Sequence, residues 1–214
     1  MSQLRNFLRH AYPYSKTRIN QRKEKKLFNK LLHEYQGKPL KVVVGSGQIY
    51  TDGWIPSEIH ILNLLRESDW TRYFEKNSLD GLLAEHVWEH LSPENGAIAA
   101  RTCHTFLKKG KRLRVAVPDG YHPDPKYIDY VKPGGHGLGA DDHKVLYNYK
   151  TFTKLFEDNG FRVEAMEYFD ENGKFHSKDW EKEDGYVYRT IRYDKRNADG
   201  KPNYTSLMID AYKE

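Results

Sequence analysis

The chain has 214 residues, of which 38% are hydrophobic, 30% charged and 14% aromatic. This length suits one domain with a sizeable core, and the aromatic content excludes an intrinsically disordered chain. No apolar run reaches the roughly 18–20 residues of a transmembrane helix. The single cysteine, Cys103, excludes an intramolecular disulfide. The first residues contain no apolar segment, so we expect no secretory signal and a cytoplasmic location.

Positive charge is concentrated at the N-terminal end. Residues 1–41 hold 11 Lys and Arg against 2 Asp and Glu, whereas the formal net charge of the whole chain is only +5. Such a basic arm could bind nucleic acid or an anionic membrane surface. Apolar residues at helical spacing instead favour an amphipathic helix over 20–36, packed on the rest of the chain. They are Leu27, Phe28, Leu31, Leu32 and Tyr35.

Strand-like and helical segments alternate from residue 40 onward. Apolar runs predict strands at 40–44, 54–59, 61–64, 80–84, 113–117, 161–169 and 204–211. A helical turn is expected at 69–74, and helices are expected at 93–107 and 149–159. Residues 120–147 lack a clear period, and a polar insertion follows the strand that ends at 169. This alternation predicts an α/β fold, with a parallel sheet and helices on both faces.

A short glycine turn, Gly45-Ser46-Gly47, follows the first predicted strand. Tyr50 stands where a dinucleotide fingerprint needs its third glycine, which weakens NAD or FAD as the ligand. Glu58, at the end of the second predicted strand, offers two acceptor oxygens to the hydroxyls of a ribose. Together the turn and the acid indicate an adenosine-containing ligand without a pyrophosphate. A plain turn and a surface glutamate remain the alternative interpretation.

Several segments together resemble class I S-adenosylmethionine-dependent methyltransferases, in particular small bacterial methyltransferase-like proteins. The matching segments are VVVGSG (42–47), GWIPSEI (53–59), LDGLLAEHVWEHLSPE (79–94), CHTFLKKGKRLRVAVPDGYHPDP (103–125) and TFTKLFEDNGF (151–161). The resemblance implies a Rossmann-like three-layer α/β/α sandwich, with a mostly parallel seven-stranded sheet and a reversed last strand. It divides the chain into a basic N-terminal helical arm (1–39) and a methyltransferase-like domain (40–214). Within that domain it implies a substrate or lid loop at about 118–148 and an insertion at about 170–203.

The resemblance also implies roles for individual residues. Glu58 would hold the ribose hydroxyls, Ile59 would pack on the adenine, and His86 or Asp119 would act as the catalytic base. The implied cofactor contacts are Val44, Gly45, Ser46, Gly47, Glu58, Ile59, Asn63, Leu64, Asp69, Trp70, Glu85 and His86. The implied substrate contacts are Tyr121, His122, His136, His143 and Tyr147. No metal ligand is assigned in this interpretation.

The sequence departs from the family pattern at three places. Ser46 stands where cysteine is usual, and Glu58 stands where aspartate is commoner. Only 32 residues separate Gly47 from Asp80, so a helix or strand must be shortened there. This shortening makes Asn63 the least secure of the assigned adenine contacts.

A second motif, His86-Val87-Trp88-Glu89-His90, matches an H-x-x-E-H zinc-protease pattern. On a helix His86 and His90 would share one face, with Glu89 as the base of a metal-dependent hydrolase. The histidines and aspartates of residues 118–148 could also hold a metal, although no ligand spacing repeats among them.

The methyl acceptor is expected to be a small molecule or a glycan intermediate, because no nucleic-acid recognition module is evident. S-adenosylmethionine would be the cofactor and S-adenosylhomocysteine the product. A non-catalytic adenosyl-binding protein on the same fold is the alternative, ahead of the metal-dependent hydrolase.

Overall fold

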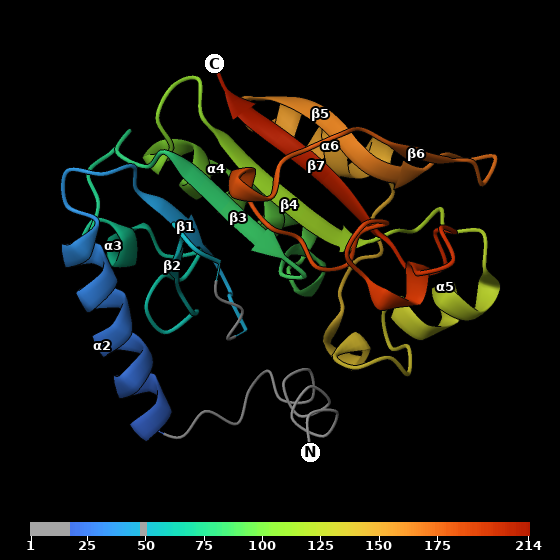
Figure 1. Ribbon diagram of the computed structural model, residues 1–214, viewed down its shortest axis with the longest axis horizontal. Helices are drawn as coiled ribbons and strands as arrows, with labels where there is room; N and C mark the ends of the chain where they lie inside the picture. The colour runs from blue at the N-terminus through green and yellow to red at the C-terminus, as the bar shows by residue number, and fades with distance from the viewer. Residues whose placement is uncertain (1–17, 48–50) are drawn as a thin grey trace.

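A seven-stranded mixed sheet forms the centre of the computed structural model, which describes residues 18–47 and 51–214 (Figure 1). The strand order is β2-β1-β3-β4-β7-β5-β6. The strands are β1 (Lys41–Val43), β2 (Ile55–Pro56), β3 (Gly81–Glu85), β4 (Arg112–Pro118), β5 (Phe161–Phe169), β6 (Phe175–Ser177) and β7 (Ser206–Lys213).

Strand directions match the Rossmann-like expectation. Strands β2, β1, β3 and β4 pair in parallel, while β7 runs antiparallel to both β4 and β5. The seven strands and the reversed last strand are therefore confirmed, and β6 adds an antiparallel hairpin partner to β5. The strand expected at 61–64 is wrong. These residues form turns, and Ile61, Leu62 and Leu64 are apolar because they are buried in the core.

Three of the described α-helices, α4, α5 and α6, begin at side-chain caps. Ser92 accepts a hydrogen bond from the Asn95 backbone N–H at the start of α4, and Asn148 forms a capping box with Thr151 at the start of α6. Asp124 caps α5, a short helix that the aperiodic sequence of this region did not indicate. The helices are α2 (Arg18–Glu34), α3 (Glu67–Trp70), α4 (Pro93–Phe106), α5 (Pro125–Val131) and α6 (Tyr149–Glu157).

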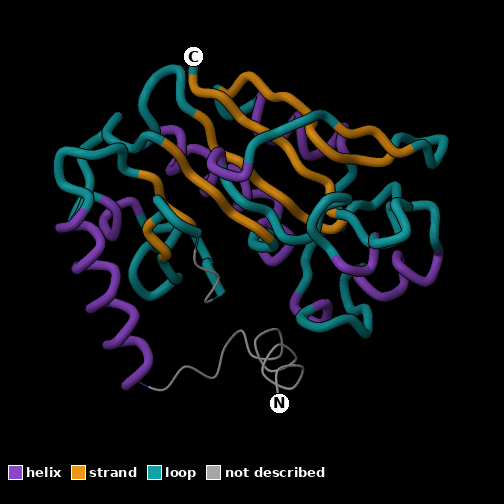
Figure 2. The backbone as a smooth tube through the Cα atoms, viewed as in Figure 1, coloured by secondary structure: helices purple, strands orange, loops and turns teal. Residues whose placement is uncertain are grey.

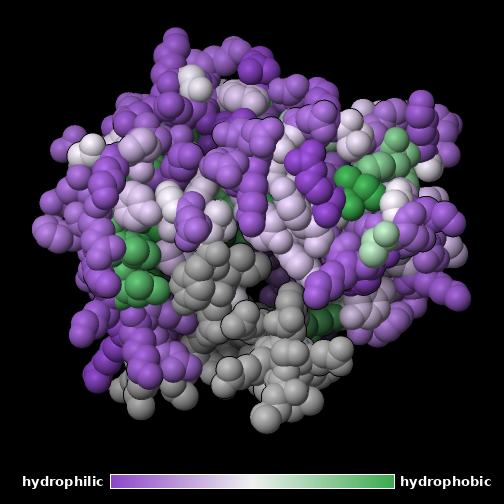
Figure 3. Space-filling model, viewed as in Figure 1, coloured by the Kyte–Doolittle hydropathy of each residue, from purple (hydrophilic) through white to green (hydrophobic). Residues whose placement is uncertain are grey.

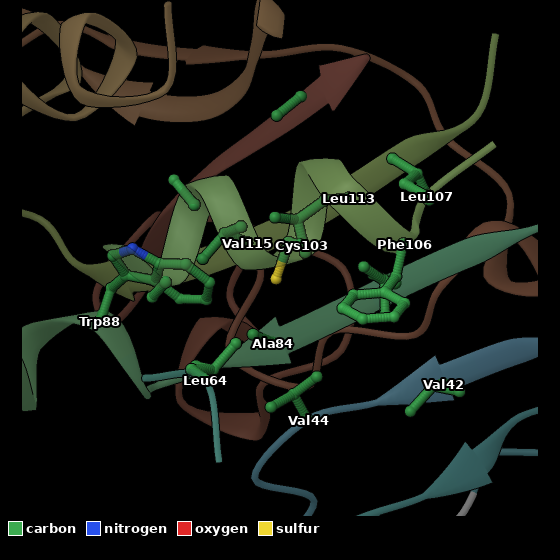
Figure 4. Close-up of a cluster of buried hydrophobic side chains, with 14 of the residues drawn as sticks. Val42, Val44, Leu64, Ala84, Trp88, Cys103, Phe106, Leu107, Leu113 and Val115 are labelled. Atoms are coloured by element: carbon green, nitrogen blue, oxygen red, sulfur yellow. The ribbon is translucent and has the colours of Figure 1, made fainter. Parts of the chain in front are cut away.

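Four of these helices cover one face of the sheet. Phe28 of α2, Trp70 of α3, Phe106 of α4 and Phe152 of α6 are all fully buried in one cluster with alternate strand residues. Figure 4 shows part of this cluster, with Phe106, Leu113 and Val115 close to Cys103. Burial of this large aromatic and aliphatic surface is the main stabilising contribution to the fold.

The opposite face is covered by the insertion rather than by α-helices. Trp180 and Val187 of the insertion pack on Val43, Leu83 and Met208 of the sheet. After β6, the described part of this segment contains two short 3-10 turns, η3 (Lys182–Asp184) and η4 (Lys195–Asn197), and is otherwise loop (Figure 2). The third layer of the expected sandwich is thus mostly irregular chain. Single apolar side chains of the insertion, such as Trp180 and Val187, pack on the sheet there instead of the apolar face of a helix.

Charged sheet residues bind the backbone of this insertion. The Glu85 carboxylate accepts two insertion N–H groups, and Glu167 accepts the Ile191 N–H at 2.9 Å. Arg114 is fully buried, forms a two-pronged ion pair with Asp210, and donates to an insertion carbonyl at 2.9 Å. These bonds satisfy backbone groups that regular secondary structure would otherwise have paired.

Helix α2 packs on the domain as the amphipathic interpretation expected. Phe28 is fully buried, and its ring lies 5.0 Å from the Tyr73 ring, edge to face. The part of the basic arm at residues 1–17 lies outside the described residues. In the described part of the chain, no helix combines the length and apolar character needed to cross a bilayer. The face in Figure 3 is mostly hydrophilic, in keeping with the mean hydropathy of −0.87.

Candidate functional site

The parallel strands β1, β2, β3 and β4 bring the polar residues that follow them to one edge of the sheet, where ligands of such folds bind. Gly45 and Gly47 follow β1 and both adopt left-handed backbone angles, with φ of +63° and +55°. A Cβ at Gly45 would lie 2.8 Å from Val87 Cγ2, so only glycine fits there without a shift of its neighbour. The turn therefore presents bare backbone at the end of β1.

The acid predicted from the sequence lies beside this turn. The Ser46 backbone N–H donates to the Ser57 carbonyl at 2.9 Å, which aligns the ends of β1 and β2. The Ser46 hydroxyl donates to Glu58 Oε1 at 2.8 Å. Ile59, the next residue, is 50% exposed although it is a large apolar side chain. Turn, carboxylate and exposed apolar surface thus lie next to one another at the ends of two neighbouring strands.

Two of the predicted adenine contacts are wrong. Leu64 is 5% exposed and Trp70 is fully buried, and both belong to the hydrophobic core. The Trp70 indole N–H donates to the Asn63 carbonyl at 2.9 Å, and its ring stacks on Phe106. Leu64 and Trp70 are therefore apolar because they pack in the core, not because they contact a ligand.

Other residues of the chain already contact the remaining predicted cofactor contacts nearby, Asn63, Asp69 and Val44. The Asn63 side-chain oxygen accepts the Leu65 backbone N–H at 2.8 Å. Asp69 is 4% exposed and lies between the guanidinium groups of Arg66 and Arg72, at 3.6 and 3.7 Å. Val44 also has its side chain in the core, so only its backbone could contact a ligand.

Glu85 is the last residue of β3 and His86 follows it, and each is held by distant parts of the chain. Glu85 accepts the backbone N–H groups of Tyr188 and Arg189 at 3.1 and 2.9 Å, so its expected place beside a cofactor is corrected to an anchor for the insertion. His86 has a left-handed φ of +55°, unusual outside glycine. Its Nε2 lies 2.9 Å from the Ser206 hydroxyl.

Glu89 is the buried partner of His86. His86 Nδ1 lies 2.8 Å from Glu89 Oε1, and the Glu89 side chain is only 1% exposed. Burial lowers the pKa of His86 well below its usual value and raises the pKa of Glu89. Residues Trp88–His90 form a 3-10 turn, η1, and not the α-helical face that the H-x-x-E-H interpretation required.

Asp119 follows β4, and its carboxylate is completely buried. Oδ1 accepts the Tyr121 backbone N–H at 2.9 Å, and Oδ2 accepts the Phe169 N–H at 2.7 Å. Burial raises the pKa of Asp119 to about 6. Because both oxygens bind backbone and none of the side chain is exposed, its predicted role as catalytic base is corrected to a clamp between the ends of β4 and β5.

The predicted substrate contacts do not form one group. His122 stacks on Tyr127 and is fixed by the Pro202 carbonyl at 3.2 Å, while Tyr147 is a core residue with 5% exposure. His136 is 68% exposed and lies near Asp129. His143 is 8% exposed and donates from Nδ1 to a backbone carbonyl at 2.7 Å. The assignment of Tyr147 is therefore wrong, because its apolar ring is packed in the core.

Two remaining features lie near these residues. Tyr121 is half-buried, and its ring lies 6.1 Å from that of Tyr149. A pocket of about 400 Å³ opens beside His122, Phe169 and Phe175, and none of the residues lining it belongs to the glycine turn or follows β2. Sequence reasoning did not single out this pocket, because its walls come from three segments that are well separated in the chain, at 122–124, 169–175 and 202–203.

Comparison with known proteins found resemblance only among solved structures. No family model and no curated protein matches the sequence. A methyltransferase from Archaeoglobus fulgidus described as SAM-dependent is 17% identical, with a TM-score of 0.47 over 90% of this chain and 94% of that one. A possible histamine N-methyltransferase from Thermotoga maritima is 10% identical, with a TM-score of 0.48 over 89% and 91%. An S-adenosylmethionine-dependent methyltransferase from Mesorhizobium loti is 14% identical, with a TM-score of 0.49 over 87% and 85%.

Proposed function

We propose that the chain binds S-adenosylmethionine at the ends of β1 and β2 and transfers its methyl group to an oxygen or nitrogen acceptor. The observation that carries this proposal is the pairing of the left-handed turn at Gly45 and Gly47 with the Glu58 carboxylate. The two glycines of the turn have no side chains, which lets a ligand approach the backbone closely. A carboxylate beside it accepts hydrogen bonds from both hydroxyls of a ribose.

Neighbouring residues complete a surface that suits a nucleoside. Ser46 holds the Glu58 carboxylate from one side, and the exposed side chain of Ile59 offers an apolar face for a flat base. Leu64 and Trp70 support this edge from within the core instead of contacting the base. Binding therefore rests on few residues, all within the 45–59 stretch.

The cofactor would supply a methyl group that its sulfonium already activates, so the protein has to bind, orient and exclude water. His86 directly follows β3 and remains the candidate base for an acceptor hydroxyl or amine. Its Nε2 faces the Ser206 hydroxyl, so the ring must exchange that contact to reach an acceptor. The acceptor proposed is a small molecule or a glycan intermediate.

A second candidate function is adenosyl binding without catalysis. It is favoured by the protein partners on both ring nitrogens of His86 and both oxygens of Asp119. A base that is engaged in this way has no lone pair directed at an acceptor.

A labelling experiment distinguishes methyl transfer from adenosyl binding without catalysis. The protein is incubated with methyl-labelled S-adenosylmethionine and a small-molecule cell extract, and labelled products are separated from the cofactor. Enzyme-dependent transfer of label supports methyl transfer. Binding of S-adenosylhomocysteine without any transfer assigns the non-catalytic function, and absence of both overturns the proposal.

A further inference from the structure

A cluster of metal-ligating side chains lies where η1 meets the loop before α6. Glu89 and His90 belong to η1, and His143 directly follows the 3-10 turn η2 (Ala140–Asp142). One ring nitrogen of each histidine and one carboxylate oxygen of Glu89 lie within 4.8 Å of one another. The His90 and His143 rings pack edge to face, with centroids 4.8 Å apart. Residues more than 50 positions apart thus bring nitrogen and oxygen donors within 4.8 Å of one another.

The polar atoms of this cluster lack the partners that burial demands. Glu89 is 1% exposed, and its Oε2 has no hydrogen-bond donor among the described residues. His90 Nδ1 is also buried without a hydrogen bond, and Asp142 Oδ2 lies 3.4 Å from it. Burying a carboxylate without a compensating partner is strongly destabilising. A cation between these donors removes that cost.

The surrounding contacts orient the donors as in a metal site. His143 Nδ1 donates to the Val131 carbonyl at 2.7 Å, which leaves the Nε2 lone pair free to ligate. His86 Nδ1 lies 2.8 Å from Glu89 Oε1, without the geometry of a hydrogen bond. Metal-ligating histidines are commonly held by a second hydrogen bond such as the one that His143 donates.

We propose that Glu89, His90 and His143 bind one zinc ion, with water as the fourth ligand. Two imidazoles and one carboxylate are a known ligand set for zinc with an open position. In a tetrahedral site with bonds of about 2.0–2.1 Å the donors are about 3.3 Å apart, so loading the site draws the side chains together slightly. His143 takes the place that the H-x-x-E-H motif gave to His86, which is turned toward Ser206.

The bound ion would fasten the loop around His143 to the end of β3. Asp142 is 60% exposed and already paired with Lys144 at 2.8 Å, so it lies outside the inner ligand set. The site shares no residue with the turn and acid of the proposed cofactor site. Zinc binding and nucleoside binding can therefore be measured and can fail separately.

The test is zinc binding to untagged, chelator-treated protein of full length. Zinc affinity and stoichiometry are measured by competition with a coloured chelator, and cobalt is added as a probe of coordination by its visible absorption. We expect one zinc per chain, a cobalt band typical of tetrahedral coordination, and at least a hundredfold loss of affinity in His90→Ala and His143→Ala. His136→Ala is the matched control, because His136 lies in the same loop but is 68% exposed and outside the cluster.

Glu89→Gln keeps the shape of the side chain and tests the site even where a histidine variant disturbs the loop. We expect this variant to lose the zinc-dependent rise in melting temperature while its metal-free form melts no lower than the parent. The proposal is overturned by parent protein that binds no zinc, or by His143→Ala and Glu89→Gln proteins that bind it as tightly as the parent. S-adenosylhomocysteine binding measured on the same samples shows which of the two proposals has failed.

Discussion

The Ser46 hydroxyl donates a hydrogen bond of 2.8 Å to Glu58 Oε1, and this bond joins the glycine turn after β1 to the residues that follow β2. It places a carboxylate next to two glycines, Gly45 and Gly47, which have no side chains. The relationship explains why the serine and the glutamate occur together, although either residue alone is unremarkable at a protein surface.

Replacing Gly45 with alanine should destabilise the protein more than replacing Gly47. Both glycines are left-handed, which costs an alanine about 1–2 kcal/mol. Only at Gly45 would the added Cβ collide, 2.8 Å from Val87 Cγ2, while none of the described atoms lies within 4 Å of a Cβ at Gly47. Chemical denaturation of both variants checks this order. Equal losses of unfolding free energy would mean that the approach of Val87 imposes no constraint.

Glu85→Gln should loosen the insertion without unfolding the domain. The carboxylate accepts two backbone N–H groups, at Tyr188 and Arg189, and hydrogen bonds to a charged group contribute about 1.5–3 kcal/mol each. Hydrogen exchange should become faster at residues 186–191 and remain unchanged in α4. Glu183→Gln, an exposed glutamate in the same insertion, is the control. Unchanged exchange in the Glu85 variant would contradict the anchoring role.

The stability contributed by Asp119 should fall as pH rises. Burial raises the pKa of Asp119 from 3.8 to about 6, so the folded protein keeps a proton that the unfolded chain has already lost between these values. The stability advantage of the parent over Asp119→Asn should therefore shrink by up to about 3 kcal/mol between pH 4 and pH 7. Urea denaturation of both proteins across this range measures the difference. A gap that stays constant or widens with pH would show that Asp119 is not held in its protonated form.

His86→Asn should lower methyl transfer and leave S-adenosylhomocysteine binding nearly unchanged. Asparagine tolerates the left-handed φ of +55°, so the backbone is preserved while the imidazole is lost. Loss of a general base reduces turnover by about 10²–10⁴-fold. kcat and KM of the variant, with its nucleoside affinity as control, check the assignment. Normal turnover would remove His86 from the mechanism.

The sequence predicted most of the sheet because apolar β-branched runs and turn residues mark buried strands directly. It also predicted the glycine turn and its acid, since both are local features at strand ends. It could not predict that irregular chain covers the second face, because Trp180 and Val187 reach the sheet as isolated anchors without a period. Leu64 and Trp70 were misassigned because the same types of apolar residue contact ligands and fill hydrophobic cores, and the sequence alone does not distinguish the two.

The roles of the polar residues were harder to predict from the sequence. Glu85 and Asp119 occur where functional acids are expected, yet each binds backbone N–H groups from segments 50 or more positions away. Glu89 was visible in the H-x-x-E-H motif, but its neighbour His143 comes from a separate loop. Only the folded arrangement shows which of these groups share a site.

Calorimetric titration of S-adenosylhomocysteine into the parent, Glu58→Gln and Glu67→Gln proteins tests the central claim most directly. Glu67 is a half-exposed glutamate on α3 and serves as the control. The account predicts that the parent and the control bind alike, and that Glu58→Gln binds about 10–100-fold more weakly because charged hydrogen bonds to the ribose are lost. No binding by the parent, or equal affinity in all three proteins, would contradict it.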